Sequence, residues 1–345
     1  MKEKFLYLFG AGASANALPI VKDSADGTVT GLAKAFKGLA VYLKNENPQH
    51  GFSPKLVKQM NENLLWLQTE SDKHQTIDTY AKYLYLMNQH SELKRLKLTL
   101  SFYLTIEQLH RNKLDSRYLI WLISILDQAI FPENIKILTW NYDFQLQLAA
   151  TNFRKESLTV HKGGGYQHSP PLVDYYPPVG NIFPHTTQDY DAMKFNMVHL
   201  NGIAGFFKEG NNGHFDNAFL KHSEVKTLLN KIIEQPESFI HLLSFAWEKG
   251  TDESTEIFRR VEFAKALASD TTILVVIGYS FPFFNRVVDK QIFDILKQSG
   301  KLKTIYFQDP YLDGTFLHNQ FGLDPKQVII KHTKKTETFY IPAEL

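Results

Sequence analysis

The sequence predicts an α/β protein with a doubly wound, mainly parallel sheet and a helical insertion. Two observations lead to this class. Short, continuous apolar runs alternate with longer stretches of helical spacing, which is typical of strands buried beneath helices. The first run also ends directly at a glycine-rich turn, Gly10-Ala11-Gly12-Ala13-Ser14. Such alternation indicates a parallel sheet that is covered by helices on both faces.

The expected strands are the apolar runs at 5–9, 135–139, 195–200, 272–278, 304–307 and 328–330. The expected helices are the stretches at 29–43, 54–68, 76–87, 93–109, 116–131, 144–152, 224–233, 236–246, 256–268 and 287–298. The strand candidates are short and end at turns, whereas the helix candidates repeat apolar residues every three or four positions.

The chain of 345 residues is expected to form a single domain, 1–345. The first strand ends near residue 9 and the next begins near 135, which is far more chain than a crossover needs. We therefore expect a helical insertion or cap at 50–131. The region 161–191 is rich in glycine, proline and tyrosine and is expected to be an irregular loop, either functional or merely mobile at the surface.

Composition excludes several classes of protein. The 38 basic and 36 acidic residues give a formal net charge of +2, so we expect no direct binding to nucleic acid. The chain has no cysteine, which excludes disulfides, thiolate nucleophiles and cysteine-ligated zinc. The apolar run at 5–9 is too short for a signal peptide, and no later run reaches the length of a membrane span. We therefore expect a cytoplasmic protein that does not bind membranes.

The turn after the first strand, Gly10 to Ser14, is a candidate phosphate-binding loop. Glycine permits a tight turn and a close approach of the backbone to a pyrophosphate. A helix that follows would point free N–H groups and its positive dipole end at the phosphates. The motif by itself is weak, because many turns between a strand and a helix contain two glycines and a third glycine is missing here.

Polar residues also follow the second strand, in the sequence Thr139-Trp140-Asn141-Tyr142-Asp143. Ligands of α/β sheets bind at the carboxyl ends of the strands. An asparagine amide can hold a ribose hydroxyl or a water, and an aspartate can accept a proton or stabilise a cationic sugar. The alternative is that Asp143 only caps the helix that follows it.

Three further turns carry polar residues at expected strand ends. His199 lies beside the third strand and could act as a base near neutral pH, although such a histidine is more often a packing residue. Gly278 and Ser280 follow the most apolar strand, and Asp309 follows the next. So many polar turns at the same sheet edge are hard to explain as independent helix caps.

Taken in order, the motifs GAGAS, TWNYD, HLNG and GYSFP resemble those of the sirtuin-like superfamily. The likeness is closest to the bacterial sirtuin-like NAD hydrolases of antiphage defence, and it extends from residue 5 to about 310. It implies a Rossmann-type domain that binds NAD at the sheet edge and attacks the nicotinamide ribose. By this resemblance Asn141, His199 and Asp143 would be catalytic. The residues that would bind NAD are Gly10, Ala11, Gly12, Ser14, Thr139, Gly278, Ser280 and Asp309.

Two features depart from the family pattern. The family places its catalytic histidine immediately before a glycine, but Asn201 occupies that position here. His199, two residues earlier, would face the same side of a strand, and His161 is the fallback. The four cysteines that hold zinc in protein-deacetylating sirtuins are also missing, so we expect no metal and no deacetylase activity.

The leading hypothesis is that the protein hydrolyses NAD, as its substrate, to nicotinamide and ADP-ribose, and acts in antiphage defence by depleting NAD. The alternative is a non-catalytic module that binds or senses NAD or an ADP-ribose-type nucleotide. The third and weaker hypothesis is that the protein is a dehydrogenase. The resemblance also implies a separate sensor subunit, such as an ATPase or an Argonaute-like protein, and we expect a homo-oligomer.

Overall fold

The computed structural model describes residues 2–20, 31–45, 52–74, 76–160, 172–177, 192–209, 216–217, 225–234, 239–241, 243–245, 247–248 and 256–345. Within them, seven parallel strands form one sheet in the order β10-β9-β8-β1-β2-β4-β3. The strands are β1 (Phe5–Phe9), β2 (Ile135–Thr139), β3 (Tyr175–Tyr176), β4 (Met197–His199), β8 (Ile273–Ile277), β9 (Thr304–Gln308) and β10 (Ile329–Thr333).

The sheet is doubly wound. From the central strand β1 the chain first builds β2, β3 and β4 on one side, and then crosses to build β8, β9 and β10 on the other. The order reverses between β1 and β8, which is the point at which such sheets bind ligands. The predicted α/β fold with a Rossmann-like sheet is confirmed.

Helices cover both faces of the sheet because its strands are apolar on both sides. In β1, Phe5, Tyr7 and Phe9 face α5 (Ser116–Ile125) and α6 (Gln145–Val160), and the rings of Tyr7 and Trp121 lie 5.0 Å apart. Leu6 and Leu8 instead join the opposite core. That core includes residues of α8 (Glu256–Ala268), α9 (Arg286–Ser299) and α10 (Phe316–Phe321).

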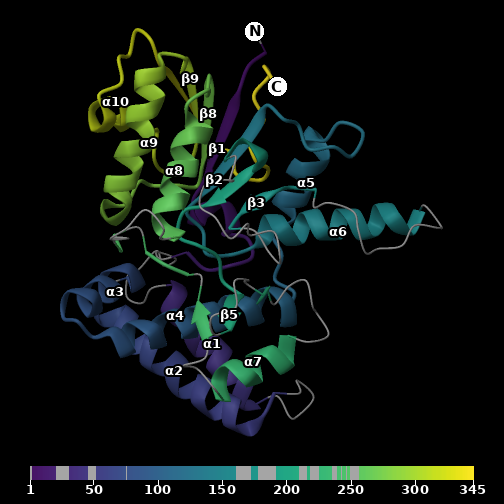
Figure 1. Ribbon diagram of the computed structural model, residues 1–345, viewed down its shortest axis with the longest axis vertical. Helices are drawn as coiled ribbons and strands as arrows, with labels where there is room; N and C mark the ends of the chain where they lie inside the picture. Colours follow the sequence, from purple (N-terminus) through teal and green to yellow (C-terminus); the bar gives the residue numbers. More distant parts are fainter. Residues whose placement is uncertain are drawn as a thin grey trace.

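A helical module lies beyond the carboxyl ends of the strands, in the lower half of Figure 1. It consists of α1 (Gly31–Asn45), α2 (Pro54–Lys73), α3 (Ile77–Leu86), α4 (His90–Thr105), a π-helix at Ile106–His110 and α7 (Val225–Glu234). In the described part of the chain it also has an antiparallel sheet of β5 (Phe206–Glu209), β6 (Asp216–Asn217) and β7 (Phe239–His241). Phe36, Leu64, Phe102 and Leu229 share its core with Phe144, which precedes α6.

The helical module differs from the predicted insertion at 50–131. It begins earlier, because α1 packs into its core, and it gains a second segment that carries α7 and the small sheet. In contrast, α5 lies within the predicted insertion but packs on the main sheet through Trp121. The helix expected to reach residue 131 ends at Ile125, because Gln128 and Ala129 adopt positive φ angles in a turn closed by Asp127 and Ile130.

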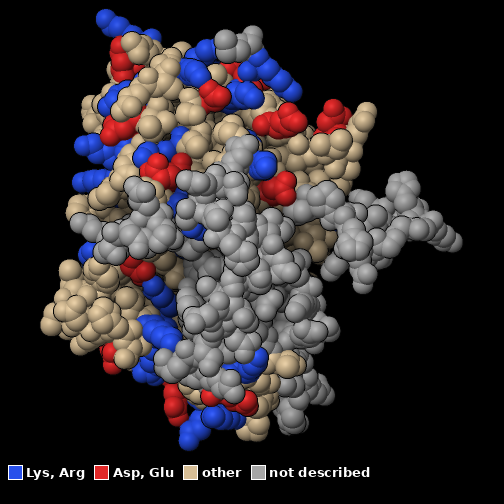
Figure 2. Space-filling view, viewed as in Figure 1, with Lys and Arg blue, Asp and Glu red and all other residues tan. Residues whose placement is uncertain are grey.

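The predicted helix at 236–246 is wrong. Phe239–His241 is strand β7, which pairs with β5. The predicted irregular region 161–191 contains the short edge strand β3, Tyr175–Tyr176. Residues 161–171 and 178–191 of this region, with His161, lie outside the described residues. No helix among the described residues is both long and apolar enough to cross a membrane. Basic and acidic side chains are interspersed on the face shown in Figure 2.

Candidate functional site

The candidate site lies where the sheet order reverses, at the turns that follow β1, β2 and β8. After β1 the chain makes one short 3-10 helix, Ala11–Ser14, instead of a long α-helix. The N–H of Gly12 donates a hydrogen bond to the carbonyl of Gly278 across 2.9 Å. Gly278 has a φ of +58°, and a Cβ placed on it would lie 2.5 Å from the backbone of Gly12. The glycines therefore allow the turns after β1 and β8 to pack backbone against backbone.

The residues of this turn differ in their exposure to solvent. Ala11 is exposed and Gly12 is half-buried, whereas Gly10 is buried. Because the Gly12 N–H already has a partner, this amide is not available to a phosphate. The predicted phosphate loop is thus shaped by contact with Gly278, and Ala11 lies on its accessible side.

A buried polar cluster forms around Ser14, which we call the Ser14 cluster: Ser14, Tyr118, Asn141 and Asp143. The amide Nδ2 of Asn141 donates to Ser14 Oγ across 3.3 Å, and the hydroxyl of Tyr118 lies 3.0 Å from the same oxygen. The carboxyl of Asp143 lies close to Ser14, whose hydroxyl lowers the pKa of that carboxyl. Three predicted site residues from segments more than a hundred positions apart thus meet in space, and Tyr118 joins them without a signal in the sequence motifs.

Asp143 caps the helix that follows it, and its carboxyl is also buried. Its Oδ1 accepts a hydrogen bond from the N–H of Gln145 across 3.2 Å and so caps α6. Burial raises the pKa of its carboxyl from 3.8 to about 6, against the opposing effect of the Ser14 hydrogen bond, and the nearby carboxylate of Asp115 raises it further. The carboxyl therefore changes its protonation state close to neutral pH.

His199 is placed as a supporting residue. It is 1% exposed, its Nδ1 lies 3.4 Å from the carbonyl oxygen of Asn141, and its Nε2 lies 2.5 Å from Nε2 of Gln147. One neutral tautomer satisfies both contacts, with Nδ1–H donating to Asn141 and Nε2 accepting from Gln147. Burial lowers the pKa of His199 to about 3. In this geometry the imidazole holds the Asn141 backbone and has no nitrogen available to act as a base.

Asn201 contacts a different carbonyl from the one that His199 contacts. Strand β4 ends at His199, so the two-residue alternation of a strand does not extend to Asn201. Its Nδ2 instead donates to the carbonyl oxygen of Trp140 across 3.0 Å. Both side chains thus contact carbonyls of the turn after β2, and the expectation that they face one cleft stays a prediction.

The other predicted residues shape the turns at the same sheet edge. The hydroxyl of Thr139 accepts a hydrogen bond from the N–H of Asn141 across 3.1 Å and is buried. Asp309 Oδ1 accepts the N–H groups of Tyr311 and Leu312, each across 2.8 Å. Ser280 is exposed on the turn after β8. Among the described residues, neither Ser280 nor Asp309 has a hydrogen bond to the Ser14 cluster.

A buried ion pair holds the first turn in place. The guanidinium of Arg117 contacts Asp115 across 2.6 Å and donates from Nη2 to the carbonyls of Gly12 and Ala13 across 3.2 and 3.1 Å. Asp115 also accepts the N–H of Asn16 across 3.2 Å. Sequence reasoning missed this pair, since an aspartate before a helix signals no more than a cap.

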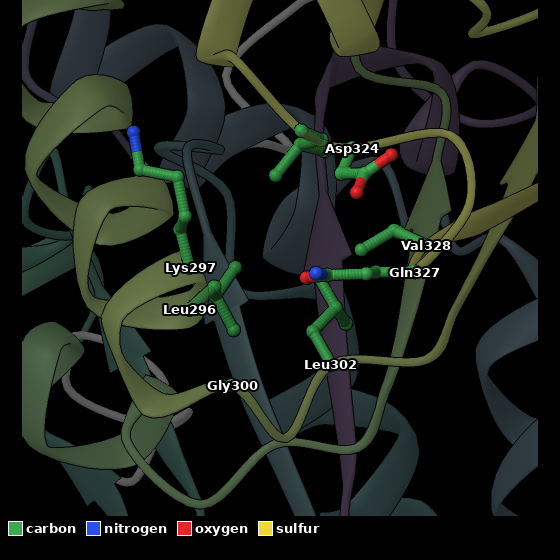
Figure 3. Close-up of a pocket in the computed structure, with 8 residues that line it drawn as sticks. Leu296, Lys297, Gly300, Leu302, Asp324, Gln327 and Val328 are labelled. Atoms are coloured by element: carbon green, nitrogen blue, oxygen red, sulfur yellow. The ribbon is translucent and has the colours of Figure 1, made fainter.

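Figure 3 shows a small hollow that is separate from this site. It is lined by Leu296, Lys297, Gly300, Leu302, Leu323, Asp324, Gln327 and Val328. These residues belong to the end of α9 and to the segments before β9 and β10, at the amino edge of the sheet. The hollow therefore lies at the edge opposite to the candidate site.

Neither a scan against protein-family models nor a search of curated proteins gives a match to this chain. The fold and the site define the class: a Rossmann-like α/β protein with a helical module and a polar cluster at the carboxyl edge of its sheet.

Proposed function

We propose that this protein hydrolyses NAD to nicotinamide and ADP-ribose. The observation that carries the proposal is the meeting of Ser14, Asn141 and Asp143 beside the Gly10 turn, where the sheet order reverses. This is the place at which doubly wound sheets bind nucleotides. The order of the motifs, which resembles that of the sirtuin-like NAD hydrolases, gives independent support.

The chemistry requires a group that stabilises a cationic sugar and a group that takes up a proton. Nicotinamide leaves the ribose with the electrons of the glycosidic bond, water adds to the same carbon, and one proton is released. A carboxyl with a pKa of about 6 is ionised at neutral pH and suits both tasks. We therefore assign the base to Asp143 in place of His199, and the positioning of the ribose hydroxyls or water to Asn141.

The remaining residues take supporting parts in this proposal. Ala11, on the accessible side of its turn, would face the pyrophosphate, and Gly10 and Gly12 would shape that turn. Gly278, Ser280 and Asp309 would lie toward the adenosine half. His199 and Thr139 would hold the backbone and turn that carry Asn141. The resemblance further supports a role in antiphage defence through NAD depletion, with a homo-oligomer controlled by a separate sensor subunit.

The experiment is to incubate the purified chain with NAD and to follow nicotinamide by chromatography. Asn141→Ala should slow release by about a hundredfold or more, as is usual when an oriented catalytic contact is lost. Asn134→Ala is the matched control: Asn134 is also buried and donates one amide hydrogen bond, to Glu3, but at the other edge of the sheet. Equal rates for Asn141→Ala and the parent would refute the assignment.

The second candidate is a nucleotide-binding module without catalysis. Asn201 favours it, because this residue occupies the histidine position of the family pattern and supplies no base there. The nearby His199 is buried and both of its ring nitrogens have partners, so it does not replace that base. Calorimetry and nicotinamide release on the same sample separate the two functions. NAD binding without turnover would favour the module, whereas turnover that is lost in Asn141→Ala would favour the hydrolase.

A further inference from the structure

Asp289, in the first turn of α9, forms a buried network that joins two turns of the candidate site. Its Oδ1 accepts a hydrogen bond from the indole Nε1 of Trp140 across 3.1 Å, and its Oδ2 accepts the hydroxyl of Tyr279 across 2.7 Å. Asn285 Nδ2 donates to the same hydroxyl across 3.0 Å. The rings of Trp140 and Tyr279 lie nearly parallel, 6.0 Å apart at 21°.

The two aromatic residues occupy particular places in the chain. Trp140 stands between Thr139 and Asn141, and Tyr279 stands between Gly278 and Ser280. Their strands, β2 and β8, flank β1 on its two sides. Asp289 therefore connects the turns on either side of the Gly10 turn, at the point where the sheet order reverses.

Burying the carboxyl of Asp289 costs free energy of folding, so the network is an expensive way to stabilise the core. Asp289 is 1% exposed, and among the described residues it forms no ion pair with Lys or Arg. Burial raises the pKa of its carboxyl from 3.8 to about 8, although the hydrogen bonds from Tyr279 and Trp140 lower it. An apolar side chain of similar size would fill this core without the desolvation penalty. What the carboxyl adds is a fixed direction for two donors.

We propose that Asp289 is a positioning residue, which locks the turn that carries Asn141 to the turn that carries Ser280 and so preorganises the site for its nucleotide. The inference rests on the proposed function for the identity of that nucleotide, NAD. The part of the proposal that concerns structure, namely that Asp289 locks the two turns together, does not depend on NAD. Fixed turns lower the ordering cost that a ligand otherwise meets on binding.

The test compares Asp289→Asn with Asp289→Leu. The amide of Asp289→Asn keeps an acceptor for Trp140 and a polar hydrogen toward the hydroxyl of Tyr279, whereas the leucine keeps neither. Leu296→Ala is the matched control, because Leu296 is fully buried on the same helix near its far end. It destabilises the same core without contact to the two turns.

Hydrogen exchange followed by mass spectrometry is read on peptides that cover residues 139–145 and 278–285. Asp289→Leu should speed exchange in both turns by about tenfold or more, and Asp289→Asn should stay within about threefold of the parent. Leu296→Ala, at an equal loss of melting temperature, should leave the two turns near the parent rate. Equal exchange in Asp289→Leu and Leu296→Ala, or faster exchange in one turn only, would overturn the lock.

Calorimetry with NAD then tests the functional half. Asp289→Leu should weaken NAD binding by about tenfold, and Asp289→Asn should restore it. Unchanged NAD binding in Asp289→Leu would overturn the preorganisation. If the parent itself binds no NAD, the proposed function fails, while hydrogen exchange still decides the lock. If Asp289→Leu does not fold, Trp140→Phe and Tyr279→Phe each remove one donor, and each should loosen both turns.

Discussion

Replacing the carboxyl of Asp143 with an amide should make the folded protein more stable and the site inactive. Burial raises the pKa of Asp143 from its ordinary value of 3.8 to about 6 in the folded chain, and each pKa unit corresponds to about 1.4 kcal/mol. Because the folded state binds the proton more tightly, stability falls as the pH rises from about 4 to about 6. Above that window the ionised carboxylate costs about 3 kcal/mol, and Asp143→Asn removes this cost.

The variant also keeps the geometry of the site. Its amide oxygen can still accept the N–H of Gln145, so the cap of α6 remains. Thermal unfolding at pH 7.5 should therefore give a melting temperature a few degrees above that of the parent, and the difference should vanish near pH 4. Nicotinamide release should fall by about a hundredfold or more, since the proposed base is lost.

Asp270→Asn is a control in which the expected change in stability has the opposite sign. The hydrogen bond and charge of Lys301 lower the pKa of this exposed carboxyl, so its loss should slightly destabilise the chain at neutral pH and leave activity unchanged. Two outcomes would refute the reasoning on Asp143. An active Asp143→Asn would exclude the carboxyl as the base, and an equal gain in stability at pH 7.5 and pH 4 would exclude its titration as the cause.

Three further predictions concern the supports of the site. Gly278→Ala places a methyl group 2.5 Å from Gly12 at a positive φ, so its urea midpoint should fall strongly; a normal midpoint would contradict the close packing. Arg117→Leu leaves Asp115 buried without its cation and should lower the free energy of unfolding by about 3–5 kcal/mol. Adding Asp115→Asn should recover part of this loss, and no recovery would contradict the ion pair. The pKa of His199 is lowered to about 3, so the parent loses stability as the pH falls below about 6.5, and His199→Gln should lose less. The activity limb near pH 6 should remain in His199→Gln, and its disappearance would return the base to the histidine.

The sequence predicts the main sheet well because its strands depend on local pattern. The runs at 5–9 and 135–139 match β1 and β2, and the stretch at 256–268 matches α8. These strands are buried on both faces, so each is a continuous apolar run bounded by turns, and one window of sequence contains the whole signal. A buried strand needs no knowledge of its partner to be identified in this way.

The errors lie where a distant partner decides the structure. Phe239–His241 is a strand because Ile240 pairs with Lys208 of β5, which the apolar spacing around it does not reveal. Likewise, α1 and α5 are both amphipathic helices, and the sequence cannot show that one packs in the helical module and the other on the sheet. The predicted insertion at 50–131 therefore leaves out α1 and includes α5.

For the candidate site, the sequence predicts where the residues lie better than it predicts what each residue does. Motif order and strand ends were enough to bring Ser14, Asn141 and Asp143 into one cluster, because the carboxyl ends of parallel strands share one edge. The role of each residue depends on burial and on the partners of individual atoms. His199 shows this most clearly, since its contacts to Gln147 and Asn141 determine its protonation state and lie outside any motif.

Contacts of individual atoms also change the interpretation of the Gly10 turn. In a phosphate loop the glycines matter because their backbone approaches the ligand, yet here the Gly12 N–H bonds to Gly278 and the two turns pack against each other. The glycines thus bring the turn after β8 against the turn after β1, and Asp289 links that turn to the turn after β2. The three turns thus contact one another at the sheet edge that holds the Ser14 cluster. The glycine motif therefore sets the shape of the site, whereas the proposed chemistry depends on Asn141 and on the carboxyl of Asp143.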